Sequence, residues 1–404
     1  MNAHRLAIIA AALTIMVAAA LATALATFSG QALPRAVRHN LSGASGTALV
    51  MTGDVDASQA AQYTAMLPAR ISAALDGTPF AFYQADWSDP LGFVSGARPA
   101  RPASAGNTPI AEAAALGGIT AHATLVSGRW PGGPARGQPI PAALPATAAA
   151  LLHVTDGDVL RMQDRISSGY VRFVVTGLYR PRQLSSSYWG LDAYAGLAGS
   201  STLSGFTTYG PLTVQAAAFA GPLAVYEGSW LAQPRTASIP AGQLTTVAGQ
   251  VGVLKQTLQD AQLLPALALS TNLPSVLNGT ASNLDVARSL LAICAVLLFL
   301  LAAAALLAVT RLLAGQREGE SAMLTARGAT RWQLARLTAA EAIPLSVAAA
   351  AAGGVAGLLL ARLFAGTSPG GTGPAGTAAG DAWPAAAAVA LGAIVIMVVP
   401  AFTT

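Results

Sequence analysis

Cysteine, lysine and charge are all scarce in this chain of 404 residues. Charged residues make up 10% of it and hydrophobic residues 53%, with a mean hydropathy of +0.54. Soluble domains carry about 25% charged residues, so this composition is typical of a membrane protein with a sizeable aqueous part. The single cysteine, Cys294, excludes an intrachain disulfide. It lies in an apolar run, where we expect a small residue that faces lipid or another helix rather than a reactive thiol.

The single lysine, Lys255, excludes a standard phosphate-binding loop, because no GxxxxGKS/T pattern surrounds it. We therefore expect any ATP to be hydrolysed by a separate polypeptide. No GxSxG elbow marks a nucleophile. The four histidines are scattered without the spacing of zinc ligands, at His4, His39, His122 and His153. We expect no catalytic residue, no metal and no cofactor in this chain, and a membrane-anchored enzyme is the least favoured class.

Positive charge belongs to the flanks of the apolar runs rather than to the region between them. The net charge is +5, whereas residues 31–285 contain fourteen basic and thirteen acidic side chains. No basic stripe with interleaved aromatic residues is present, so the charge indicates membrane topology and no nucleic-acid partner.

Four apolar stretches meet the requirement of about 20 residues for crossing a hydrocarbon layer of about 30 Å. They are Leu6 to Phe28, Ser289 to Thr310, Ala342 to Ala361 and Pro384 to Phe402. An alternative for the first is a secretory signal peptide, with Ala24 and Ala26 near a cleavage point. Its apolar run exceeds the roughly 7–15 residues of a signal-peptide core, which favours an uncleaved anchor.

The segment from Arg311 to Glu341 sets the orientation. It carries five arginines between two spans, and such clusters mark the side that is not translocated. We predict that both termini lie in the cytoplasm and that residues 29–287 lie outside. The fold class is then an integral α-helical membrane protein with four transmembrane helices, one N-terminal and three C-terminal. A large α+β extracytoplasmic domain is inserted between the first and second. The domains are a 1–28 anchor, a 29–287 external domain and a 288–404 transmembrane region.

The external region alternates turn signals with short strand and helix patterns. Ala57 to Leu75 predicts one or two short helices around Pro68. Strands are predicted at Thr47 to Met51, Pro79 to Tyr83 and Tyr170 to Leu178, the last with one better-buried face. Thr155 to Asp158 predicts a turn into a strand at Val159, and Asx-turn chemistry explains its two aspartates better than a calcium site does.

Three features of the sequence leave alternatives open. Trp130 is expected to anchor a local core, whereas Tyr188 and Trp189 at a loop edge leave room for a binding role. The amphipathic helix Gln243 to Ala261 either forms part of a stalk or packs on its own domain. Gly353, Gly354 and Gly357 in the third span form either a GxxxG-like packing seam or a run of small residues without such a role. Pro344 is expected in the first turn of that span.

The charged segment carries a pattern that resembles a known family. Its positions are Arg317-x-x-Glu320, Met323-Leu324, Ala326-Arg327-Gly328-Ala329, Gln333-Leu334 and Glu341. They resemble the segment that follows the first core helix of FtsX-like permeases, the MacB-type class of ABC transporter subunits. Ser127 to Pro131, Ala142 to Leu152, Gly157-Asp158 and Val174 to Pro181 are similar to the periplasmic core domain of that class. The chain is expected to be a fragment or a minimal form, since it stops soon after the fourth span.

This resemblance implies a permease subunit in the lipid bilayer of the bacterial plasma membrane, which forms a homodimer or heterodimer of permeases and works with an ABC-type ATPase. The inner segment is then expected to form two short helices that turn at Gly328 and contact the ATPase. The expected contact residues are Arg317, Glu320, Met323, Leu324, Arg327, Gly328, Arg331, Trp332, Gln333, Leu334 and Glu341. The implied function is mechanotransmission, or export of an amphipathic substrate such as a lipoprotein or peptide. The alternative is a non-transporting, membrane-anchored protein that regulates a cell-wall hydrolase or a sensor kinase.

Overall fold

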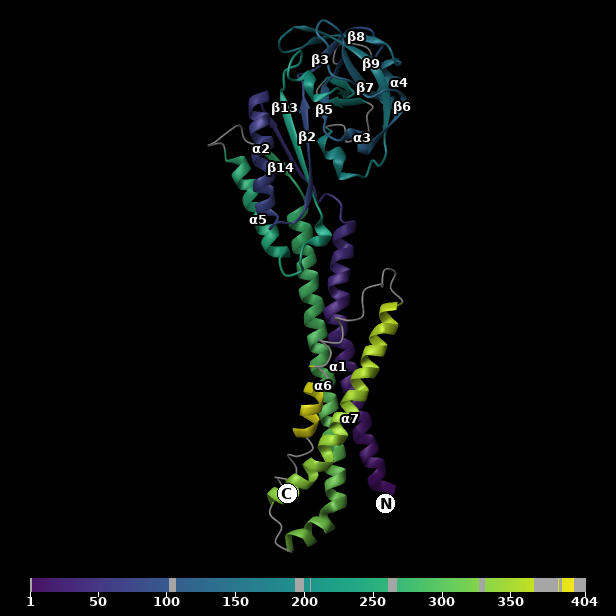
Figure 1. Ribbon diagram of the computed structural model, residues 1–404, viewed down its shortest axis with the longest axis vertical. Helices are drawn as coiled ribbons and strands as arrows, with labels where there is room; N and C mark the ends of the chain where they lie inside the picture. The colour runs from purple at the N-terminus through teal and green to yellow at the C-terminus, as the bar shows by residue number, and fades with distance from the viewer. Residues whose placement is uncertain are drawn as a thin grey trace. The chain divides into compact units, whose positions relative to one another are not determined.

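The computed structural model describes residues 2–101, 107–192, 200–203, 205–260, 267–326, 331–366, 384 and 387–395. Its contacts divide the chain into two compact units (Figure 1): unit 1 is Met1–His39 with Ala281–Thr404, and unit 2 is Asn40–Thr280. Unit 2 is shorter than the predicted external domain because helices α1 (Asn2–Gly43) and α6 (Leu273–Ala326) continue well beyond their apolar stretches.

Unit 1 is built from α1, α6 and α7 (Arg331–Gly366), with a further helical segment at residues 387–395. Among the described residues, three helices are long and apolar enough to cross a membrane, through Ile9–Thr27, Leu273–Val309 and Ile343–Leu360. They overlap the first three predicted spans, although the second begins at Leu273 rather than at Ser289. Most of the fourth predicted span, Pro384 to Phe402, lies outside the described residues and stays a prediction.

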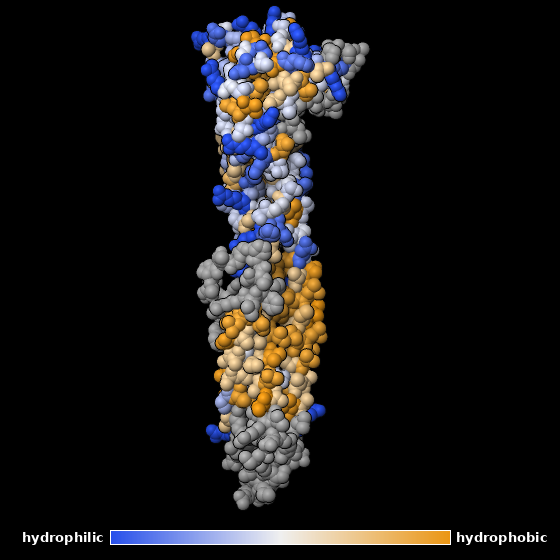
Figure 2. Space-filling view, turned by 90° about the vertical axis from the view of Figure 1, so that its right-hand side faces the viewer, coloured by the Kyte–Doolittle hydropathy of each residue, from blue (hydrophilic) through white to orange (hydrophobic). Residues whose placement is uncertain are grey.

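On the face shown in Figure 2, hydrophobic side chains dominate the coloured part of unit 1, whereas hydrophilic and hydrophobic residues are mixed over unit 2. Only 6% of the apolar stretch of α6 is buried by other parts of the chain, and large residues such as Leu297 and Leu301 are exposed. Leaving so much apolar surface in water is unfavourable, and a surrounding bilayer removes that cost.

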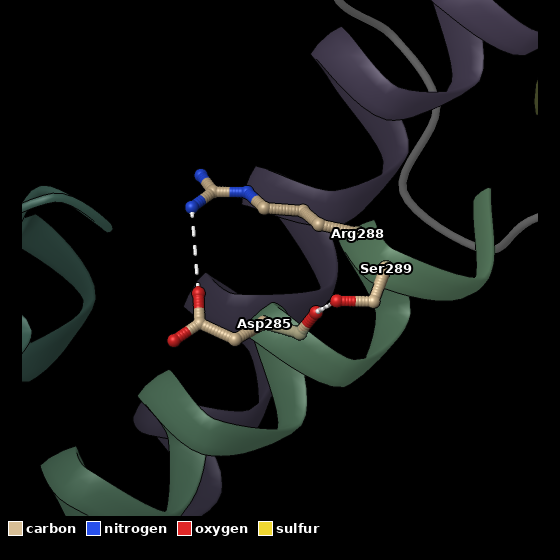
Figure 3. Close-up of polar contacts among 3 residues, drawn as sticks. All are labelled: Asp285, Arg288 and Ser289. Carbon is tan, nitrogen blue, oxygen red and sulfur yellow. Dashed lines mark hydrogen bonds and ion pairs between the residues drawn. The ribbon is translucent and has the colours of Figure 1, made fainter. Parts of the chain in front are cut away.

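The polar residues Asp285, Arg288 and Ser289 lie on α6 where its apolar run begins (Figure 3). Arg288 Nη1 lies 3.8 Å from Asp285 Oδ1, and Ser289 Oγ donates to the carbonyl of Asp285 at 2.8 Å. Both charged side chains are mostly exposed, so the ion pair contributes little to stability. The ion pair instead marks a boundary, because the uncharged part of α6 begins just after it, where the sequence predicts the second span.

Unit 2 contains one 14-stranded mixed sheet with the strand order β10-β11-β4-β3-β8-β9-β7-β12-β5-β2-β13-β1-β14, and β6 pairs with β9 outside this path. The strands are β1 (Leu49–Asp54), β2 (Phe80–Trp87), β3 (Leu91–Ser95), β4 (Thr108–Ala111), β5 (Ala113–Leu116), β6 (Ala123–Gly128), β7 (Ile140–Pro145), β8 (Val159–Asp164), β9 (Tyr170–Pro181), β10 (Ser200–Leu203), β11 (Phe206–Tyr209), β12 (Leu212–Thr213), β13 (Glu227–Pro234) and β14 (Ala268–Ser270). The helices are α2 (Ala57–Ala74), α3 (Ile119–His122), α4 (Ala146–Leu152) and α5 (Leu244–Gln259), with 3-10 turns η1 (Ser187–Leu191), η2 (Ala216–Ala218) and η3 (Thr236–Ser238).

The three predicted strands are present as β1, β2 and β9, and the strand after the Thr155 turn is β8. Along β9, Phe173, Val175, Gly177 and Tyr179 are buried and alternate with more exposed neighbours, which confirms the predicted one-sided burial. The predicted turn is also confirmed, since Asp158 Oδ2 accepts from the backbone N–H of Thr155 at 2.7 Å.

One part of the unit 2 core lies where α2 and α5 pack together against β13 and β14. The helix α2 is a single helix with Pro68 inside it, so the alternative of two short helices is wrong. It starts at a capping box in which Asp56 accepts from Ser58 and Gln59 backbone N–H groups. The buried face of α5, from Leu244 to Leu258, packs within unit 2. The helix therefore packs on its own domain and is not part of a stalk.

The aromatic residues of the loop around η1 belong to the core. Tyr188 is 0% exposed and Trp189 2% exposed, in a cluster that also holds Tyr179 and Leu231. Tyr188 Oη donates to the carbonyl of Gly117 at 3.0 Å. A binding role for Tyr188 and Trp189 is thus wrong, because distant strands cover both rings. The partly buried indole of Trp130 packs on the same cluster, 5.6 Å from the Tyr179 ring, as predicted.

Candidate functional site

The residues predicted to contact an ATPase fall at the adjoining ends of α6 and α7. Four of them, Arg317, Glu320, Met323 and Leu324, belong to the last turns of α6. Five more, Arg331, Trp332, Gln333, Leu334 and Glu341, belong to the first turns of α7. The structure describes the backbone of these nine residues and not their side chains. Arg327 and Gly328 lie outside the described residues.

The structure corrects the prediction of two short inner helices. Residues 311–326 continue α6 without a break from its apolar stretch, and α7 begins at Arg331, twelve residues before the apolar stretch starts at Ile343. Hydropathy indicates only where a helix is apolar, and these polar turns continue the same backbone hydrogen bonding. Each polar end is therefore part of the same helix as its apolar stretch, without an intervening loop.

Both of these helix ends lie at the end of unit 1 that also holds the N-terminus (Figure 1). This end gathers the basic residues that flank the apolar stretches, including Arg5, Arg317 and Arg331. Of the arginines in the charged segment, Arg311 and Arg336 are described with their side chains, and both are exposed. The opposite end of the apolar part of α6 carries the Asp285–Arg288 pair.

The glycines of α7 form a close contact with α1. A Cβ atom added at Gly353 would collide with the backbone carbonyl of Met16, and one added at Gly357 would collide with that of Ala20. These glycines are four residues apart, as are their partners, and the numbering rises in the same direction along both helices. The helices α1 and α7 are therefore parallel here, and their backbones are in van der Waals contact, as in GxxxG packing. The packing-seam alternative for these glycines is confirmed.

Small and polar residues complete this contact. Ala19 is fully buried, and Thr23 is 1% exposed with its Cβ atom 2.9 Å from the position of a Cβ at Gly357. The hydroxyl oxygens of Thr23 and Ser346 are buried without a hydrogen-bond partner among the described residues. Both lie in the apolar stretches of their helices, where an unpaired hydroxyl is costly.

Pro344 lies well inside α7 rather than in its first turn, because the helix already starts at Arg331. Proline has no N–H to donate, so the carbonyl of Ala340 lacks its usual partner four residues later. The sequence-based placement assumed that the helix starts with the apolar stretch, and that assumption is wrong.

A lateral apolar hollow of 810 Å³ opens between α1, α6 and residues 388–393 of unit 1. Its walls come from α1 between Leu13 and Ala26 and from α6 between Arg288 and Leu306. Arg288 is the only charged residue in this lining. The hollow can accept an apolar chain whose polar group remains at the Arg288 end.

The pattern in the charged segment agrees with a comparison to known families. Residues 292–404 match the family model of the FtsX-like permease C-terminal domain. This part of the chain is an FtsX-like permease domain. The match and the apolar helices indicate a membrane protein with a permease-type role, and FtsX-like permeases generally work with an ATPase partner. No curated protein matches the chain. The match does not reach unit 2, so the likeness of unit 2 to a MacB-type core domain stays a prediction.

Sequence reasoning did not find the partner of the α7 glycines. The signal that was available is the run of small residues in the first span, Ala18 to Ala20 and Ala22 to Ala24 with Thr23 between them. Small residues at four-residue spacing on two spans allow close approach, but they do not specify which two helices meet.

Proposed function

We propose that this chain is the permease subunit of an ABC transporter, and that a separate ATPase binds the ends of α6 and α7. The observation that carries this proposal is the FtsX-like permease match over 292–404 together with the continuity of those ends with the apolar helices. A movement imposed by the ATPase at residues 311–341 would pass along α6 and α7 without an intervening loop. The chain hydrolyses no ATP and needs no cofactor in this proposal.

The proposed topology has the N-terminus and residues 311–341 in the cytoplasm and unit 2 outside. Three observations support it: the shared location of these segments at one end of unit 1, their arginines, and the parallel course of α1 and α7. The fourth span, at Pro384 to Phe402, then returns the chain to the cytoplasmic side. In this arrangement unit 2 is joined to unit 1 through α1 and α6.

The proposed substrate is an amphipathic molecule, such as a lipoprotein or a peptide, that is handled at the outer leaflet. The lateral hollow supports this class, because its lining is apolar except at Thr14 and Arg288. In the alternative the chain transports nothing, and movement of unit 2 regulates a cell-wall hydrolase or a sensor kinase.

Co-purification tests the ATPase interaction. We expect a P-loop ATPase to be retained by the tagged chain in detergent, and to be lost from the Arg327→Glu and Trp332→Ala variants. Charged and aromatic anchors dominate interfaces of this kind, so each loss should be at least about tenfold. Arg180→Glu, at an exposed position of β9 in unit 2, is the matched control and should retain the ATPase. Equal retention by all variants would contradict the proposed contact.

Cysteine labelling tests the topology. Cys294 is first replaced by serine, which leaves a chain without thiols. A membrane-impermeant maleimide added to intact cells should then label the variant Ser95→Cys, at an exposed position of β3, and should not label Ser321→Cys. Labelling of Ser321→Cys in intact cells would invert the orientation and remove the basis for a cytoplasmic ATPase.

A further inference from the structure

One surface of unit 2 has no part in the proposed coupling to an ATPase. The outward side of β3, β8 and β9 presents exposed apolar side chains, namely Val94, Val159 and Tyr170, whose exposed fractions are 48%, 47% and 59%. Val159 lies opposite Val174 on β9, and Gln163 lies opposite Tyr170. The alternate residues of the same strands, such as Leu160, Met162 and Phe173, are fully buried in the core. The exposed side chains therefore lie on one side of the sheet, because their neighbours along each strand are buried on the other side.

Two arginines lie directly opposite each other in the middle of this face. Arg161 on β8 pairs with Arg172 on β9 in the antiparallel register, and both are exposed. Like charges in this arrangement destabilise a sheet, because the Cβ atoms of opposite residues are only about 4.5–5.5 Å apart. A third guanidinium, that of Arg165, reaches over Gly92 on β3, with Nη1 3.5 Å from the position of a Cβ there. We refer to Val94, Val159, Arg161, Arg165, Tyr170 and Arg172 as the arginine face.

The guanidinium groups of the arginine face have no carboxylate partner among the described residues. The group of Arg161 lies over the Tyr170 ring, 4.6 Å from its centroid, and Arg172 donates to the carbonyl of Gly137 at 3.0 Å. The nearest carboxylates along the chain serve turns. Asp164 accepts from the N–H groups of the β8–β9 hairpin, and Asp158 accepts from Thr155. Positive charge thus accumulates on a face where the fold provides nothing to neutralise it.

We propose that the arginine face is a docking surface for another protein that presents carboxylate side chains among apolar ones. The charge of the face favours an acidic partner, and the two opposed arginines destabilise the pairing of β8 with β9. The exposed tyrosine and valines between the arginines indicate a protein, because tyrosine and arginine with apolar neighbours are typical of protein interfaces. A polyanion would gain nothing from the apolar side chains. This inference does not depend on the proposed coupling to an ATPase.

Photo-crosslinking in intact cells tests the proposal on the full chain. Tyr170 is replaced by benzoylphenylalanine, which keeps an aromatic ring at the centre of the face, and the crosslinked peptide is identified by mass spectrometry. The expected adduct is a peptide of another protein that contains several carboxylates. Val253 on α5, which is 62% exposed, carries the same photoreactive group in the control chain and should not give that adduct.

Charge reversal tests whether the arginines hold the partner. Arg161→Glu should reduce the Tyr170 adduct at least about tenfold, since it removes a charge-assisted contact and repels the carboxylates. Arg180→Glu, an equal charge change on the same strand as Arg172 but outside the face, should leave the adduct unchanged. Unfolding does not explain the loss, because Arg161→Glu places a carboxylate opposite Arg172 and should keep the melting temperature equal or raise it. If Arg161→Glu nevertheless lowers the melting temperature, Arg165→Glu in the exposed hairpin replaces it with the same expected loss.

Any other outcome overturns the proposal. An adduct with a second copy of this chain would make the face a self-association surface, and an adduct with lipid or a cell-wall polymer would assign it to a different class of ligand. Three other results would show that the arginine face holds no acidic protein. These are the absence of any adduct, a crosslinked peptide without carboxylates, and an adduct that is insensitive to charge reversal at Arg161 and Arg165.

Discussion

The contact between α1 and α7 predicts a specific cost for adding one methyl group at Gly357. In an exposed helix, replacing glycine by alanine stabilises by roughly 0.5–1 kcal/mol. At Gly357 the new Cβ atom would overlap the carbonyl of Ala20 and lie 2.9 Å from the Cβ of Thr23. Neither neighbour is the end of a flexible side chain, so the helices must separate, at an overpacking cost of about 1–3 kcal/mol. The balance is a net destabilisation of up to about 2.5 kcal/mol.

Thermal unfolding of the full chain in detergent, followed by circular dichroism at 222 nm, measures this cost. In a domain of about 150–250 residues, each kcal/mol of destabilisation lowers the melting temperature by about 2–4 °C, so Gly357→Ala should lower it by up to about 10 °C. Gly357→Leu should lower it further. The matched control is Gly279→Ala in α6, where no atom lies within 4 Å of the added methyl and the melting temperature should stay the same or rise. If Gly357→Ala behaves like Gly279→Ala, α1 and α7 do not approach each other as closely as the structure indicates.

Two further predictions concern unit 2. Tyr188→Phe removes the hydrogen bond to the Gly117 carbonyl and should destabilise the chain by about 0.5–1.5 kcal/mol in the same melting experiment. Because Tyr188 is a core residue, the Tyr170 photo-crosslink should not change in this variant. Burial raises the pKa of Glu227 above its ordinary value of 4.5, with further contributions from the carboxylates of Asp54, opposite it on β1, and Glu112. The folded state therefore holds this proton more tightly than the unfolded state, and the stability that this contributes is lost as the pH rises above about 4.5 through the raised pKa. Glu227→Gln should reduce the decline in melting temperature over that range; an unchanged pH profile would contradict the assignment.

Local patterns in the sequence predicted those elements of unit 2 whose structure depends on neighbouring residues. The alternation in β9 and the turn chemistry of Asp158 follow from side-chain periodicity and short-range hydrogen bonding, and both are confirmed. The burial of Tyr188 was not predictable in this way. Its ring stacks on that of His122 in α3, with the centroids 3.8 Å apart, and packs edge-to-face with that of Tyr83 in β2 at 5.2 Å. Both residues are far away in the sequence, so a loop-like context gave the wrong environment.

For the candidate site, the sequence predicted where the charged segment lies and which family it resembles, because arginine clusters beside apolar runs reflect membrane insertion. It did not predict that α6 and α7 continue through that segment, since the polar turns around Glu320 and Gln333 carry no apolar periodicity of their own. It also did not identify α1 as the partner of Gly353, because close packing depends on two surfaces together. The roles of the individual contact residues stay predictions.

The position of Pro344 divides α7 into two segments of unequal stiffness. Beyond the proline, Gly353 and Gly357 fasten the helix to α1, so that segment can bend only if the pair bends together. At the proline, the missing N–H weakens the backbone at the junction with the turns that begin at Arg331. A force perpendicular to the axis of α7 at its first turns would therefore bend the helix near Pro344, whereas a force along the axis would be transmitted to α1.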